Sequence, residues 1–229
     1  MPERKSVSPL SPQVSRDSED GSLTGEPCLG APGALLVIIS GPSGVGKDTI
    51  IRTLKQHFPD PKRHFVVTYK SRPRRPDEVD GIDYHFVSPE QFRELRAAGE
   101  LLEAAEVHGH WSGTPRDQVV QALAAGHDAI LKIDVQGARA IREKVPEALM
   151  VFVAPPSFEA LTGRLRGRAT ESASDFDRRQ RDAALELARQ DDYDHVVVNE
   201  TGQVLRTASR IDEIMDAAHE LYRDRRITV

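Results

Sequence analysis

The sequence of 229 residues contains a single cysteine, Cys28. One cysteine cannot form a disulfide within the chain, and a chain of this length without disulfides is typical of a reducing compartment. Long apolar runs are also missing: the run that starts at Ala34 ends at Ile39, whereas a membrane span needs roughly 20 residues. We therefore expect a soluble, cytoplasmic protein that does not associate with membranes.

The chain also lacks an excess of positive charge. Lys and Arg total 31 against 36 Asp and Glu, which gives a formal net charge of −5. A protein that coats nucleic acid carries a basic excess, so we expect no nucleic-acid partner. The basic residues are mostly arginine, whose planar fork binds phosphate and carboxylate groups, and a local anion-binding site therefore remains open.

The length allows one domain with appended lobes, at roughly 150 residues per domain. Residues 1–33 are rich in Pro, Ser and Gly and contain no aromatic residue, so we expect them to form a disordered tail without a core. From residue 34 onward, short apolar runs alternate with amphipathic stretches, which is typical of an α/β fold with a parallel sheet flanked by helices. The expected strands are 35–39, 129–133, 149–153 and 195–198.

Three helices can be predicted from local signals. Ser88 and Gln91 form a capping box with Pro89 at the first helical position, which predicts a helix over 89–98. Ser157 predicts the start of another helix, from Phe158 to about residue 166. Near the C-terminus, helical spacing predicts a helix that packs on the core, through Ile211, Ile214, Met215, Ala218 and Leu221 or Tyr222.

A glycine-rich segment follows the first strand and ends at Lys47, with a helix-like stretch after it. The pattern G-x-x-x-x-G-K between a strand and a helix is typical of a loop whose backbone amides bind polyphosphate, while the lysine reaches the β and γ phosphates. An ordinary glycine-rich turn is the alternative, and the lysine argues against it. The expected ATP-binding residues are Gly41, Pro42, Ser43, Gly44, Val45, Gly46, Lys47, Asp48 and Thr49.

Asp48 departs from this loop pattern, which has Ser or Thr after the lysine to bind Mg²⁺. A carboxylate about 6 Å from a phosphate charge is repelled by roughly 3 kcal/mol at an effective dielectric near 20. A magnesium ion between the two groups reverses the sign. We therefore expect Asp48 to ligate Mg²⁺, directly or through its waters.

Six motifs occur in order along the chain: GPSGVGK at 41–47, SRPRRPDEVDGIDYHFVS at 71–88, LLEAAEVHG at 101–109, GTPR at 113–116, IDVQGA at 133–138 and PPS at 155–157. With these motifs the chain resembles the guanylate kinases over residues 35–200. The resemblance implies the fold of P-loop nucleoside monophosphate kinases, with an α/β core, a small mixed lobe that binds GMP and a helical lid. The implied boundaries are 34–64, 118–163 and 182–229 for the core, 65–117 for the lobe and 164–181 for the lid.

The resemblance also implies a GMP site. Glu103 matches the glutamate that accepts hydrogen bonds from N1–H and the 2-amino group of guanine; adenine offers no such pair of donors and would leave the carboxylate unpaired. Taken alone, Glu103 would be interpreted as a surface acid. Asp134 ends an apolar strand, where an acid commonly meets Mg²⁺ waters or the acceptor, and a helix N-cap is the structural alternative. The complete implied GMP site is Thr68, Arg72, Arg75, Tyr84, Glu103, Gly113, Thr114 and Asp134.

Lid arginines supply cations to the transferring phosphoryl group in this family. The matching residues are Arg164, Arg168 and Arg179, which with Lys47 form the implied catalytic set, and Asn199 matches a residue near the adenine of ATP.

Three positions near the implied acceptor depart from the family. Ser112 stands before Gly113, where the family usually has a phosphate-binding tyrosine. Lys70 and Lys132 stand where threonine and aspartate are more common. Serine is too short to make the tyrosine's contact unaided.

The implied activity is transfer of the γ-phosphoryl group of Mg·ATP to GMP or dGMP, which gives ADP and GDP in purine nucleotide metabolism, by a monomer or a homodimer. Two alternatives remain open. A kinase that acts on ribose 1,5-bisphosphate also carries Asp after the loop lysine, and scaffold proteins contain inactive guanylate-kinase-like domains that bind partners. Such inactive domains typically lack the loop lysine and the lid arginines.

Overall fold

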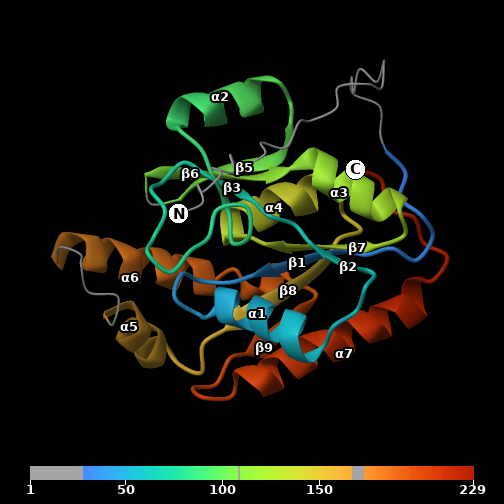
Figure 1. Ribbon diagram of the computed structural model, residues 1–229. Helices are drawn as coiled ribbons and strands as arrows, with labels where there is room; N and C mark the ends of the chain where they lie inside the picture. Colours follow the sequence, from blue (N-terminus) through green and yellow to red (C-terminus); the bar gives the residue numbers. More distant parts are fainter. Residues whose placement is uncertain (1–27, 108, 167–172) are drawn as a thin grey trace, which may run out of the picture.

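The structure, a computed structural model, describes residues 28–107, 109–166 and 173–229. A larger β-sheet lies at its centre with helices on both sides, and a smaller sheet with one helix lies above it in the view of Figure 1. The larger sheet has the strand order β2-β7-β1-β8-β9. All four strand pairs are parallel. Its strands are β1 (Leu36–Ser40), β2 (Arg63–Phe65), β7 (Asp128–Lys132), β8 (Leu149–Ala154) and β9 (His195–Val198).

The central strand β1 is buried on both faces, which explains its uninterrupted apolar sequence. Val37 and Ile39 face a cluster built with α1, α5, α6 and α7. Leu36 and Ile38 face a second cluster, built with α3 and α4. The surrounding helices are α1 (Lys47–His57), α3 (Arg116–Ala124), α4 (Val135–Lys144), α5 (Phe158–Arg166), α6 (Ala173–Leu187) and α7 (Val204–Tyr222), with a 3₁₀ turn η1 (Gln190–Asp192).

The smaller sheet has the order β4-β3-β6-β5 and mixes parallel and antiparallel pairs. Helix α2 (Pro89–Ala97) covers it and buries Phe92 against it. Its strands are β3 (Tyr69–Lys70), β4 (His85–Phe86), β5 (Leu101–Val107) and β6 (His110–Pro115).

The expected elements are present. All four predicted strands occur with ends within one residue of the prediction, and the helices that begin at Pro89 and Phe158 start where the capping residues indicate. Ser88 and Gln91 make both hydrogen bonds of the capping box. Helix α7 buries Ile211, Ile214, Met215 and Ala218, whereas Leu221 is exposed. The α/β fold with a parallel sheet and a smaller mixed sheet is confirmed.

Part of the segment expected as a tail is paired with the C-terminus. Cys28 and Gly30 donate backbone hydrogen bonds to Val229 and Ile227, at 3.0 Å and 2.8 Å. Residues 1–27 lie outside the described residues. The last part of the expected tail, residues 28–33, thus lies against the folded core.

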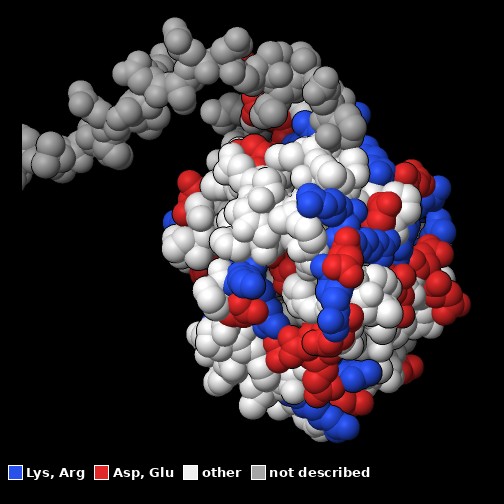
Figure 2. Space-filling model, turned by 90° about the vertical axis from the view of Figure 1, so that its right-hand side faces the viewer, with Lys and Arg blue, Asp and Glu red and all other residues white. Residues whose placement is uncertain are grey.

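Charges of both signs mix on the surface. Figure 2 shows Lys and Arg side chains interspersed with Asp and Glu on one face, so the described residues of this face form no continuous basic surface. Among the described helices, none combines the length and apolar character that a membrane span requires.

Candidate active site

The phosphate loop lies between β1 and α1, at the carboxyl end of the core sheet. Gly41 has a φ of 139°, and a Cβ there would lie 2.3 Å from the carbonyl oxygen of Val153. Only glycine fits this approach. The Lys47 ammonium donates to the carbonyl oxygens of Gly41 and Pro42, and burial lowers its pKa. The loop therefore holds a lysine at the N-terminus of a helix, where an anion binds favourably.

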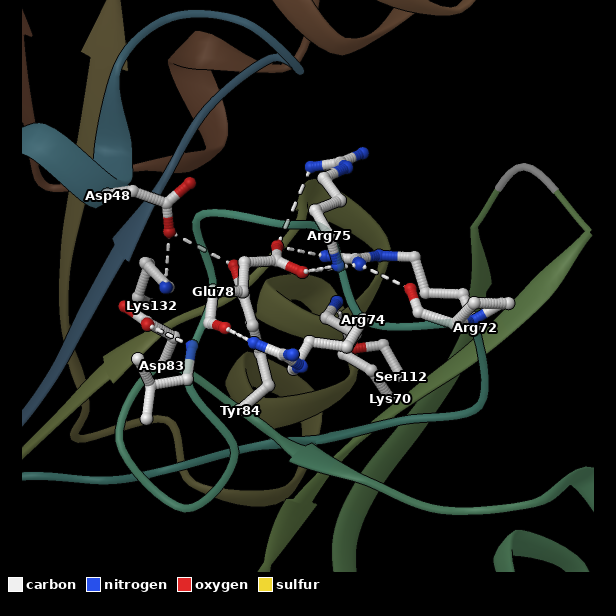
Figure 3. A network of polar contacts seen from close by, with 12 residues as sticks. Asp48, Lys70, Arg72, Arg74, Arg75, Glu78, Asp83, Tyr84, Ser112 and Lys132 are labelled. Carbon is white, nitrogen blue, oxygen red and sulfur yellow. Dashed lines mark hydrogen bonds and ion pairs between the residues drawn. The ribbon is translucent and has the colours of Figure 1, made fainter.

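The carboxylate of Asp48 connects the phosphate loop to the end of β7 and to the residue before β4. Its Oδ1 accepts hydrogen bonds from the Tyr84 hydroxyl, at 3.0 Å, and from the Lys132 ammonium. Burial opposes ionisation, but the lysine and the hydroxyl outweigh it and lower the pKa of Asp48 to about 2. Within the described part of the chain no hydrogen bond reaches Oδ2, which points away from these partners in Figure 3. Oδ1 of Asp48 thus accepts two hydrogen bonds, while Oδ2 accepts none from the described residues.

A loop of three arginines is organised by Glu78, which is 8% exposed. Arg72 donates two hydrogen bonds to its carboxylate. The backbone N–H of Arg75 donates to the same group at 2.9 Å, and Arg74 donates to the Glu78 carbonyl. Figure 3 shows these side chains converging on Glu78. The buried carboxylate therefore holds the loop in shape through charge-assisted hydrogen bonds.

Glu103 lies on β5 and is 3% exposed. Its Oε1 accepts a hydrogen bond from the Thr114 hydroxyl at 2.7 Å. Its Oε2 is buried and has no hydrogen-bond partner in the described structure. Burial raises the pKa of Glu103 to about 7. A Cβ on Gly137 would lie 2.7 Å from Oε2. The site therefore presents a buried acceptor that lacks a donor.

Asp134 acts as a helix cap with one carboxylate oxygen and leaves the other without a partner in the described structure. It caps α4, since its Oδ1 accepts hydrogen bonds from the backbone of Gln136 and Gly137. Its Oδ2 is buried and, among the described residues, has no partner. The other expected GMP-site residues Thr68 and Gly113 are buried as well.

A cleft with a volume of about 470 Å³ lies between the phosphate loop and the arginine loop. The buried residues Thr68, Glu103, Gly113 and Thr114 are not among the residues that line it. Trp111 lines it and stacks on Phe92, with ring centroids 5.8 Å apart. The expected site residues on its wall are Ser43, Gly44, Gly46, Lys47, Asp48, Arg72, Arg75, Tyr84, Asp134 and Arg179. The phosphate loop and the arginine loop therefore face a common space.

Two expected site residues contact the back of the phosphate loop. The buried Asn199 donates to the carbonyl oxygen of Val45 at 2.7 Å, and Arg164 donates to the same oxygen at 3.2 Å. Arg164 also donates to the Asn199 carbonyl. Both side chains support the loop in this conformation. Arg168, the remaining expected lid residue, lies outside the described residues.

Polar residues outside the expected site also shape this region, and Lys70 and Glu186 line the cleft itself. Glu78 organises the arginines, Lys70 donates to Ser112, and Glu186 of α6 accepts a hydrogen bond from the backbone N–H of Ser43 at 3.1 Å. The sequence offered a reason to consider Lys70, because it stands where the family more often has threonine. Glu78 and Glu186 are ordinary helix or loop acids by sequence.

Comparison with known proteins agrees with this geometry. Residues 34–218 match the family model described as guanylate kinase. A guanylate kinase of Mycobacterium leprae is 50% identical over 166 residues, 72% of this chain and 78% of that protein. One of Mycobacterium tuberculosis is 47% identical over 184 residues, 79% of this chain and 88% of that protein.

A solved structure supports the same assignment. The crystal structure of guanylate kinase from Anaplasma phagocytophilum matches with a TM-score of 0.66 and 31% identity, and the match covers 83% of this chain and 88% of that one. The chain belongs to the guanylate kinase family.

Proposed function

We propose that this chain transfers the γ-phosphoryl group of ATP directly to GMP or dGMP, with the guanine held by Glu103 and Asp134. The observation that carries the proposal is the pair of buried carboxylate oxygens, Glu103 Oε2 and Asp134 Oδ2, that lack donors in the described structure. Guanine supplies two adjacent donors, N1–H and the 2-amino group, that suit such acceptors. A ribose bisphosphate has no such pair of N–H donors.

The acceptor phosphate binds at the arginine loop in this proposal. Arg72 and Arg75 supply paired N–H donors, which suit a phosphate dianion. Tyr84 adds a hydroxyl from the same wall of the cleft. Glu78 holds Arg72 through its guanidinium and Arg75 through its backbone N–H. Thr114 orients Glu103, and the buried Thr68 and Gly113 complete the guanine end.

The ATP phosphates bind at the loop of residues 41–49. Backbone amides at the start of α1 and the Lys47 ammonium meet the negative charge. Lys47 donates to two loop carbonyls in this structure, and we expect it to turn toward the β and γ phosphates when ATP binds. Asn199 and Arg164 brace the loop, which keeps the amides in position for the phosphates.

Asp48 fits a magnesium ion that accompanies ATP. Its Oδ2 is open and lies beside the phosphate loop, and Mg²⁺ is commonly held by one or two carboxylates together with substrate phosphates. No cluster of three or more His, Cys, Asp or Glu that could hold a metal occurs within the described residues. The ion supplies charge neutralisation and alignment of the phosphates when bound.

The lid completes the proposed mechanism. Arg179 lies on α6 and lines the cleft; we expect it to stabilise charge on the transferring group, together with Arg164 and Arg168, when residues 164–181 and 65–117 close over the core. Closure excludes water, which would otherwise accept the phosphoryl group. The transfer needs no covalent intermediate, because alignment and charge stabilisation provide the rate gain. We further propose a cytoplasmic enzyme, monomeric or dimeric.

A coupled assay of ADP release tests the function with GMP, dGMP, AMP, UMP and ribose 1,5-bisphosphate, each with and without Mg²⁺. We expect turnover with GMP and dGMP in the presence of Mg²⁺. Glu103→Gln should lower kcat/KM for GMP by at least about a hundredfold, with ATP affinity unchanged. Glu106→Gln, an exposed position on the same strand, is the control. Absence of turnover with GMP would refute the proposal.

A further inference from the structure

Lys70 and Ser112 lie directly opposite each other on the antiparallel strands β3 and β6. The Lys70 ammonium donates a hydrogen bond to the Ser112 hydroxyl at 2.7 Å (Figure 3). We propose that Lys70, aimed by Ser112, is a further ligand of the acceptor phosphate, beside Arg72, Arg75 and Tyr84. This inference rests on the proposed phosphate site at the arginine loop.

The position of the ammonium supports this role. Lys70 Nζ lies 5.3 Å from the centroid of the Tyr84 ring, and Arg72 Cζ lies 5.5 Å from the same centroid. Both side chains line the cleft, as Tyr84 does. A single tyrosine ring is thus flanked by an ammonium and a guanidinium. One anionic group seated beside that ring would lie within reach of both cations.

The charge of Lys70 is not balanced by a carboxylate. An ammonium has three donors, and Ser112, an uncharged acceptor, takes one of them. Within the described part of the chain, no carboxylate forms an ion pair with Lys70. Burial accordingly lowers its pKa to about 8, although Asp134 and Glu103 act in the opposite direction. A partly buried cation without a counter-ion is suited to an anionic ligand.

Ser112 gives this lysine its direction. A serine side chain is small, and Ser112 is 2% exposed, so the lysine chain can lie across it toward the cleft. The hydroxyl then fixes the end of an otherwise flexible four-carbon chain. Lys70 and Ser112 together would therefore supply a phosphate ligand at the position where the family usually has a phosphate-binding tyrosine. An ammonium acts on phosphate as a point charge, so its contribution should decrease with salt.

The test measures binding of GMP and of guanosine, without ATP or Mg²⁺, by titration calorimetry. We expect Lys70→Met to weaken GMP binding about 10- to 30-fold and guanosine binding less than twofold, because guanosine lacks the phosphate. Lys70→Arg should recover most of the affinity, and Ser112→Ala should cost about threefold. Lys62→Met, at an exposed position outside the cleft, is the matched control. Thermal unfolding of each variant verifies that it folds.

Two results would overturn the inference. GMP affinity within twofold of the parent in Lys70→Met would exclude a phosphate contact. Equal losses for GMP and guanosine would show that Lys70 supports the pocket without touching the phosphate. Arg72→Met distinguishes a failure of the underlying site: if it weakens GMP binding while Lys70→Met does not, only the role of Lys70 is wrong. If Arg72→Met also has no effect, the phosphate site itself is wrong.

Discussion

The carboxylate of Glu103 packs against the α-carbon of Gly137, so closely that a Cβ at position 137 would lie 2.7 Å from Oε2. Gly137 is in the first turn of α4, whose N-cap is Asp134. The helix that carries one proposed guanine ligand thus also forms the wall against the other. Since real Cβ atoms do not approach so closely, a larger residue at position 137 would force the Glu103 carboxylate to move.

Gly137→Ala should displace the Glu103 carboxylate. KM for GMP should rise at least about tenfold, because a shift of about 1 Å in a binding group is enough to weaken binding by that factor. KM for ATP should stay within twofold. Steady-state kinetics with each substrate varied measures both. Gly163→Ala is the control: it lies in α5 with no atom within 4 Å of the new Cβ, so it should leave kinetics unchanged and stabilise the protein by about 0.5–1 kcal/mol. An unchanged KM for GMP in Gly137→Ala would contradict the placement of Glu103.

Glu103→Gln should stabilise the ligand-free protein at pH 8. The folded state raises the pKa of this carboxyl from 4.5 to about 7, so the folded protein holds the proton more tightly than the unfolded chain. Stability is therefore lost as the pH rises through this window, by up to about 3 kcal/mol. Glutamine does not ionise. Denaturant unfolding at pH 4 and pH 8 should show a gain for the variant at pH 8 only; equal stabilities at both values would contradict burial of the charge.

Affinity for GMP should be highest between about pH 7 and pH 8. Protonation of Glu103 would turn one of its acceptor oxygens into a donor that faces the guanine donors, so GMP binding weakens below about pH 7. Lys70 must be protonated, so GMP binding weakens above about 8. The charged groups that act on Lys70 are Glu103, Asp134, Lys132 and Arg72. Calorimetry from pH 5.5 to 9 measures the profile. The alkaline decrease should disappear in Lys70→Met and for guanosine; its persistence in either would assign it to another group.

Asp48→Ser should retain activity. The Mg²⁺ concentration that gives the half-maximal rate should change several-fold. The variant loses a carboxylate beside the phosphates and releases Lys132 and Tyr84 from their shared partner. The Mg²⁺ dependence of ATP binding, measured by calorimetry, gives a second readout without turnover. Asp224→Ser, at an exposed position near the C-terminus, is the control. Identical Mg²⁺ titrations of variant and parent would refute a role of Asp48 at the ion.

His219→Ala should destabilise the fold without affecting catalysis. Asp128 is almost fully buried at the start of β7, and it pairs with His219 Nε2 at 2.9 Å while accepting from the Leu35 backbone. Losing one partner of a buried carboxylate costs about 1–3 kcal/mol. Denaturant unfolding measures the loss. Since Asp128 lies at the opposite end of β7 from the cleft, kcat and KM should be unchanged at 25 °C, and a large kinetic effect would contradict this separation.

The sequence was sufficient for the elements whose signals are local. A buried apolar run, a glycine-rich loop and a capping box each lie within a few residues, so β1, the phosphate loop and α2 could be predicted. Strands β3 and β4 are only two residues long and have no periodicity to detect. They exist because β3 pairs with β6 and β4 pairs with β3.

The polar contacts of the site depend on pairs that are distant in sequence. Lys132 and Asp48 are 84 residues apart, and Lys70 and Ser112 are 42 apart. Motif matching identified these positions as departures from a family, one at a time. Their pairing follows from strand register and from the order of strands in the sheet, which single-residue patterns do not encode.

Trp111 is an intrinsic fluorescent probe of the cleft. It is the only tryptophan of the chain, and it lines the cleft between the phosphate loop and the smaller sheet while Arg96 lies over its ring at 5.0 Å. Indole emission from this enzyme therefore originates at one point in the cleft, beside the proposed acceptor site. An unlabelled sample should report the arrival of GMP in a stopped-flow instrument, on the timescale of a single turnover.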